Sequence, residues 1–142
     1  MLLLLIMQVS NVDVRFRVDE SLVLQIETPV VDLGMIDPIS KEMERRSAIM
    51  LTVFANTDWE LVVKPSDDFI SQNGDVIPIN RLSLRVNGED YVKMERDGVP
   101  LLKGGTTPEE GVPVNIDLKL KLTWDDVAGS YSTTLTFTLM RL

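Results

Sequence analysis

Alternation of apolar and polar residues with a period of two runs through most of the chain, and it constrains the fold more than any other feature. The clearest case is NIDLKLKLTW, residues 115–124, in which every second side chain is apolar. Because successive side chains of a β-strand point to opposite faces, such a segment is typical of a strand with one buried face. The pattern predicts a strand through this segment, with Trp124 on the buried face.

Further segments show the same alternation. They are residues 12–18, 22–27, 48–55, 59–64, 82–86 and 133–140. Gly, Pro, Asn and Asp residues, which favour turns, lie between them. Only SKEMERRSA, residues 40–48, could form a helical turn, with Ser40 as its N-cap. Short strands that are apolar on one face predict an all-β fold: an antiparallel β-sandwich, Ig-like or pilin-like, of roughly eight or nine strands.

The composition narrows the classes of function. A chain of 142 residues fits one domain, residues 1–142, and a net charge of −8 argues against a nucleic-acid partner. The chain has no Cys and no His, which excludes Ser-His-Asp and Cys-His catalysis and removes the commonest zinc ligands. We therefore expect no enzymatic activity, no cofactor and no metal. An enzyme of this composition would have to use carboxylates, Lys, Tyr or Ser.

The amino-terminal residues 1–7, MLLLLIM, form an apolar run that is too short for a membrane-spanning helix, which needs about 20 residues. Two compatible interpretations remain open: a remnant of a secretory signal peptide, or an edge strand. Soluble monomers avoid contiguous exposed apolar patches. We therefore expect this run to pair along a sheet edge, with the protein as a homo-oligomer or bound to other envelope proteins.

The stretch Trp124-Asp125-Asp126 raises the question of a metal site or of paired catalytic carboxylates. The residues that follow, VAGSY, supply the Gly of a turn and the start of the next strand. Short polar side chains such as Asp hydrogen-bond to their own backbone in turns. We therefore interpret both aspartates as the corner of a hairpin.

A second acidic stretch, SDDFISQNGD, offers oxygen ligands at Asp67, Asp68, Asn73 and Asp75. Its spacing is not that of an EF-hand calcium loop, so we expect solvated turns. Two carboxylates for glycoside hydrolysis need only a suitable separation in space, which the sequence leaves open. The segment GGTTPEEG, residues 104–111, lacks the lysine of a phosphate-binding loop and is interpreted as a flexible connection.

Aromatic residues are the remaining candidates for binding. Trp59 begins an alternating segment after a turn, and we expect it to face the core. If it does not, Trp59, Tyr91 or Tyr131 could form a platform on which a carbohydrate stacks.

Two segments point to a family. AGSYSTTLTFTL, residues 128–139, resembles the closing hairpin of secreted bacterial β-sandwich proteins: the spore-coat-U-like and archaic pilus subunits and the WxL-type cell-wall modules. VFANTDWELVV, residues 53–63, is similar to their turn-Trp-strand element, and the two segments together cover under a fifth of the chain. Neither the Cys pair of many pilus subunits nor a second Trp-x-Leu motif is present, so no functional residue is carried over.

The resemblance implies an exported protein of the periplasm, cell wall or surface. Our leading expectation is a non-catalytic structural or interaction module of the bacterial cell envelope. The alternatives are a carbohydrate-binding β-sandwich and, third, a carboxylate-based hydrolase; a cytoplasmic location is the alternative to export.

Overall fold

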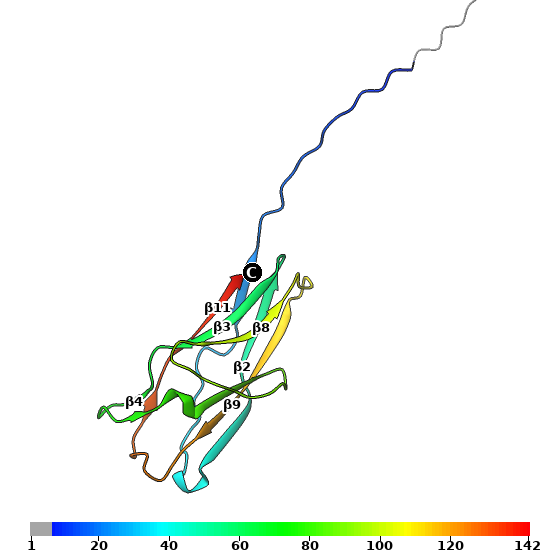
Figure 1. The fold of residues 1–142 in the computed structure, drawn as a ribbon. Coiled ribbons are helices and arrows are strands. Elements are labelled where there is room, and N and C mark those ends of the chain that lie inside the picture. Colours follow the sequence, from blue (N-terminus) through cyan, green and yellow to red (C-terminus); the bar gives the residue numbers. More distant parts are fainter. Residues whose placement is uncertain (1–6) are drawn as a thin grey trace, which may run out of the picture.

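The computed structural model describes residues 7–142, in which two main antiparallel sheets pack face to face (Figure 1). The larger sheet has the order β1-β2-β9-β6-β7, with β1 Leu22–Ile26, β2 Glu42–Ala55, β9 Val112–Lys121, β6 Leu82–Val86 and β7 Val92–Lys93. The smaller has the order β11-β3-β8, with β11 Leu135–Arg141, β3 Trp59–Pro65 and β8 Val99–Gly104. The predicted all-β sandwich is confirmed.

A third, small sheet accounts for most of the difference in strand number. It has the order β10-β4-β5, with β10 Tyr131–Ser132, β4 Phe69–Ser71 and β5 Val76–Ile77. The described chain therefore has eleven strands instead of eight or nine. Strands of two or three residues are too short to show an alternation, so the sequence pattern does not reveal them.

The helical turn predicted for residues 40–48 is wrong. A 3-10 turn, η1, covers Pro38–Ser40, and Asp37 caps it by accepting the Ile39 N–H at 2.9 Å. Most of the predicted turn belongs instead to strand β2. A β-bulge interrupts the register of β2 near Ser47, whose φ is +50°, and this irregularity breaks the alternation that would have identified a strand.

The core lies between the central strands of the two sheets. Leu51 and Val53 of β2 and Leu61 and Val63 of β3 are at most 1% exposed. Trp59 is 2% exposed, and its indole Nε1–H donates to the Gly105 carbonyl at 2.9 Å. The predicted position of Trp59 in the core is therefore confirmed.

Trp124 does not lie on the buried face, as the alternation had predicted. Strand β9 ends at Lys121, and the indole is 74% exposed. The Thr123 N–H donates to the Asp126 carboxylate at 2.7 Å, and the Asp126 N–H donates to the Thr123 carbonyl at 3.1 Å. This turn takes the chain out of the sheet before Trp124.

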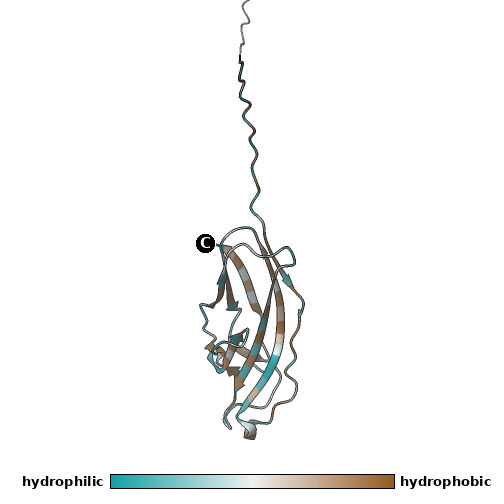
Figure 2. Cartoon of the chain, turned by 90° about the vertical axis from the view of Figure 1, so that its right-hand side faces the viewer, coloured by the Kyte–Doolittle hydropathy of each residue, from teal (hydrophilic) through white to brown (hydrophobic). Residues whose placement is uncertain are grey.

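Residues 7–20, which we call the arm, run as an extended segment away from the sandwich (Figures 1 and 2). Residues 12–18 were predicted to form a strand, but none is formed in the described part of the arm. The apolar run for which a signal-peptide remnant or an edge strand was predicted lies outside the described residues, apart from Met7. No helix within residues 7–142 has the length and apolar character that crossing a membrane requires.

Candidate functional site

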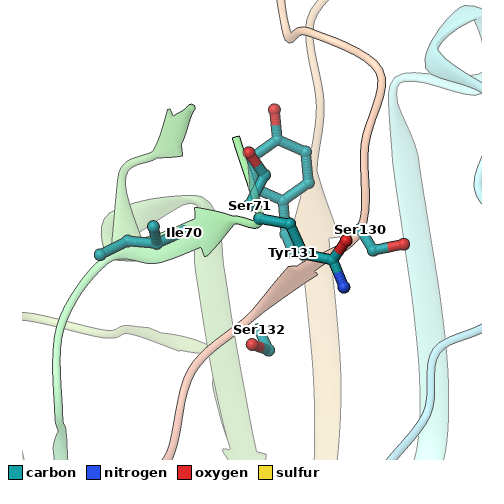
Figure 3. A pocket seen from close by; sticks show the side chains of 6 residues that line it. Ile70, Ser71, Ser130, Tyr131 and Ser132 are labelled. Atoms are coloured by element: carbon teal, nitrogen blue, oxygen red, sulfur yellow. The ribbon is translucent and has the colours of Figure 1, made fainter. Parts of the chain in front are cut away.

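A shallow groove lies where the small sheet meets the connection between β9 and β10. Strand β4 pairs with β10 so that Ser71 stands opposite Tyr131. Gly129 lies beside them, and a Cβ there would lie 3.4 Å from the Ser71 Cβ, an ordinary contact distance. The hollow has a volume of about 300 Å³ (Figure 3). Its lining residues are Ile70, Ser71, Gln72, Ser130, Tyr131 and Ser132.

We call this hollow the Tyr131 groove, after its largest side chain. The position of the Tyr131 side chain is fixed. Its hydroxyl donates to the Val127 carbonyl at 2.5 Å. Burial raises the pKa of the phenol, and the nearby carboxylates of Asp75 and Asp126 raise it further. The phenol is therefore neutral at pH 7. Opposite it, the Ser71 hydroxyl accepts the Asp75 N–H at 3.0 Å.

The lining of the Tyr131 groove contains hydroxyl groups, one side-chain amide and one aromatic ring, but no residue that is charged at neutral pH. Such a surface can exchange hydrogen bonds with a neutral ligand while the ring contacts its apolar part. A larger hollow of about 620 Å³ borders residues 14–17 of the arm. Because four consecutive residues of one extended segment line it, no second element closes it around a ligand.

Tyr91 lies on the outer face of the larger sheet and is already in contact with two cations. The Arg85 guanidinium and the Lys119 ammonium lie 4.6 and 4.5 Å from the centre of its ring. Burial raises the pKa of the phenol; Arg85 opposes this, and Glu44 and Asp117 add to it. The ring is therefore occupied by side chains of its own fold. With Trp59 buried as well, Tyr131 is the member of the proposed aromatic platform that remains available.

Several carboxylates have a shifted pKa, and every resolved shift among them is downward. They are Glu44, Asp68, Asp117 and Asp126, which pair with Arg46, Arg96, Arg85 and Arg81 respectively. At Glu44 and Asp68 the hydrogen bond from arginine is the largest cause of the lowered pKa. At Asp117 and Asp126 burial acts to raise the pKa, but a backbone N–H and the arginine outweigh it. A glycosidase acid needs a raised pKa, so none of these four groups fits that role.

The predicted acidic turn of residues 67–75 is tied to the fold. The Asp68 carboxylate is 11% exposed, accepts the Ile79 N–H at 2.8 Å and pairs with Arg96. Asp67 lies 3.9 Å from the same guanidinium, and Asn73 is exposed. Within residues 7–142, no three acidic side chains gather into a set that could hold a metal ion. Asp68 therefore anchors the turn that carries β5.

The stretch Trp124-Asp125-Asp126 is a turn, as predicted, but it is not the corner of a hairpin, because β9 pairs with β2 and β6 whereas β10 pairs with β4. Its two aspartates differ, however. Arg81 donates to both carboxylate oxygens of Asp126, at 2.9 and 3.3 Å, while Asp125 is exposed. Asp126 thus fastens the connection after β9 to the 3-10 turn η2, Ile79–Arg81.

Sequence reasoning named Tyr131 but missed the residues around it. Ser71 and Gln72 precede Tyr131 by about 60 residues, and β4 is only three residues long. A strand of that length gives no alternation to find. The turn chemistry of Asn73-Gly74 was the available signal, because it marks where the chain reverses beside the groove.

No family model matches the chain, and no curated protein matches it. One solved structure that is similar is a family 123 glycoside hydrolase from Clostridium perfringens, described for glycolipid glycan hydrolysis. The identity is 14% and the TM-score 0.46; the match covers 71% of this chain but only 18% of that one. The expected non-catalytic structural or interaction module of the cell envelope is contradicted by this enzyme, and we withdraw it. The likeness assigns no activity to this chain.

Proposed function

We propose that this domain binds a neutral carbohydrate in the Tyr131 groove. The observation that supports the proposal is the half-buried Tyr131 ring, which Val127 fixes at its hydroxyl and which lies among uncharged hydroxyl and amide groups. A sugar offers hydroxyl groups to such partners and an apolar C–H face to the ring.

Charge favours a neutral ligand over an anionic one. The chain has a net charge of −8, and no Lys or Arg lines the Tyr131 groove, so an anion would meet repulsion without a local cation to offset it. The volume of about 300 Å³ lies at the small end of ligand sites. This size suits a short stretch of glycan.

We propose binding without hydrolysis at this position. The groove lining carries no carboxylate. A retaining or an inverting glycosidase requires two carboxyl groups about 5 to 10 Å apart across the scissile bond. Incubation with the bound glycan should therefore leave it intact, and release of reducing ends would contradict this part of the proposal.

Calorimetric titration with a panel of neutral mono- and oligosaccharides tests the binding. Tyr131→Ala should weaken binding on the order of tenfold or more, about 1.4 kcal/mol. Tyr131→Phe keeps the ring and should lose less. Trp124→Ala is the control, because it removes an exposed aromatic side chain that does not line the groove. Absence of binding by the unmodified protein across the panel, or equal losses in Tyr131→Ala and the control, would refute the proposal.

Export from the cytoplasm also remains a proposal, and the apolar residues 1–7 are the feature that favours it. Fractionation of the source cells tests it directly. Recovery of the native protein wholly in the cytosol would contradict it.

A further inference from the structure

The arm carries an apolar stripe that nothing in the described chain covers. Its apolar side chains lie at every second position from Val12 to Val18 and are between 74% and 86% exposed. Asp13, Arg15 and Arg17 occupy the alternate positions. This is the pattern of a strand with one buried face, yet the segment has no strand partner among residues 7–142. Soluble monomers rarely expose a contiguous apolar stripe, so we expect a partner to cover this one.

One flank of the sandwich is incompletely covered. Strands β1 and β11 are the edge strands on this side, and β1 packs beside β11 across the two sheets. Apolar side chains here pack on the core but are only partly buried: Leu22, Leu24, Val31, Leu33, Leu135, Phe137 and Leu139. On the opposite side, Met94 and Val99 are at most 6% exposed, although Leu101 and Leu102 of β8 are also only partly buried. The β1–β11 flank therefore offers apolar surface and a free strand edge.

The arm is held so that it points away from its own flank. Asn56 donates to the Asp19 carbonyl at 2.8 Å and accepts the Ser21 N–H at 2.8 Å, and Glu20 pairs with Arg141 at 2.8 Å. The arm projects beyond one end of the sandwich. Strand β1 starts at the base of the arm and runs along the flank toward the other end (Figures 1 and 2).

To cover its own flank, the arm would have to reverse direction at residues 19–21, where these contacts fix it. No Gly or Pro occurs between residues 8 and 28 to provide such a turn, and Asp19, which could favour one, already has its carbonyl bound by Asn56. A second copy of the chain can receive the arm without breaking any of these contacts.

We propose that the arm of one copy adds as a strand along β11 of a second copy and covers its β1–β11 flank. The segment 12–18 has the same length as β11, which has seven residues. Its apolar stripe would extend the half-buried row of Leu135, Phe137 and Leu139, while Asp13, Arg15 and Arg17 stay in water. Backbone pairing along a free edge supplies the hydrogen bonds that the arm lacks. The contact is heterologous unless two copies exchange arms reciprocally.

Light scattering of the full chain over a range of concentrations tests self-association. The expected mass exceeds the 16.0 kDa of one chain. The double variant Val14→Asp/Phe16→Asp should be monomeric. Arg15→Asp is the matched control, because it changes the net charge by the same two units on the other face of the arm, and it should associate like the unmodified chain. Since the arm is exposed in the single chain, both variants should fold, and at concentrations where the unmodified chain is monomeric neither should alter the thermal melt.

A monomeric mass for the unmodified chain at every concentration would overturn the proposal. The proposal would also be overturned if the double variant associated as strongly as the Arg15→Asp control.

The absence of cysteine allows a second test, of which edge receives the arm. The Arg15→Cys variant is mixed with Thr136→Cys or with Thr138→Cys, whose side chains lie on the outer face of β11, and is then oxidised. We expect a disulfide-linked heterodimer with at least one of them, because adjacent strands bring Cβ atoms within reach. The control partner is Lys103→Cys on β8, the other edge of the same sheet. Cross-linking to β8 in place of β11 would overturn the assigned flank.

Discussion

Gly104, the last residue of β8, lies against the buried indole of Trp59. A Cβ on Gly104 would lie 2.5 Å from Cζ2 and 2.7 Å from Cε2 of that ring, which is closer than atoms can approach. The indole cannot move into solvent, because it is 2% exposed and its N–H bonds to the Gly105 carbonyl at 2.9 Å. Gly104→Ala must therefore shift either the indole or the end of β8. We expect a loss of about 1–3 kcal/mol in the free energy of unfolding, as for overpacked cores.

The assay is urea unfolding followed by tryptophan fluorescence in a Trp124→Phe background. The chain has two tryptophans, so this background leaves Trp59 as the sole reporter. Gly105→Ala is the control. Its Cβ would lie 3.3 Å from an Asp58 carboxylate oxygen, which a small side-chain rotation relieves. We expect this control to stay within about 0.5 kcal/mol of its parent.

Equal effects of the two glycine substitutions, or a neutral Gly104→Ala, would refute the reasoning. In either case the indole would not be packed on the backbone of β8 as described. A Gly104→Ala variant with an unchanged urea slope and a lower midpoint would support it, because only stability would then have changed.

The remaining predictions concern acidic residues. Asp126→Asn should cost roughly 1–3 kcal/mol in urea unfolding, because it weakens the charged hydrogen bonds from Arg81. Asp125→Asn, on an exposed residue of the same turn, should cost about 0.5 kcal/mol or less, and equal costs would contradict the assignment. Burial acts to raise the pKa of Asp117, but the Ser47 N–H and Arg85 outweigh it and hold the pKa below its ordinary value. The stability that Asp117 contributes is therefore complete above its unfolded pKa of about 3.9 and lost as the pH falls through the lower folded pKa. In Asp117→Asn, the free energy of unfolding measured in urea should fall less steeply as the pH decreases below about pH 4. An unchanged dependence on pH would count against the ion pair between Asp117 and Arg85.

The sequence alone was sufficient to locate the long strands. Alternation over five or more residues correctly located β3, β6, β9 and β11, because each of them buries one face against the other sheet. It placed Trp59 in the core for the same reason. The pattern failed where the backbone departs from regular pairing. At Ser47 a bulge stabilised by Asp117 shifts the alternation, and after Lys121 a turn removes Trp124 from the sheet although its position fits the pattern.

The candidate site was less predictable because it depends on pairing between distant short segments. Nothing local indicates that Ser71 faces Tyr131 or that Arg81 binds Asp126. The arm illustrates a different limit. Residues 12–18 have the alternation of a strand, but a strand also needs a partner, and the pattern of one segment says nothing about where that partner lies.

The order of strands in the two sheets has a consequence for how the chain folds during synthesis. Strand β2 pairs with β9, and β3 with β11, and the contact between Ser47 and Asp117 spans 70 residues. At about 5–20 residues per second, a ribosome needs roughly 4–14 s to make that span. Throughout this interval β2 can pair with β1 on one edge, but its other edge lacks β9. The nascent chain must therefore keep the open edge of β2 from pairing with other chains for seconds, and the larger sheet is expected to be completed only once β9 has emerged.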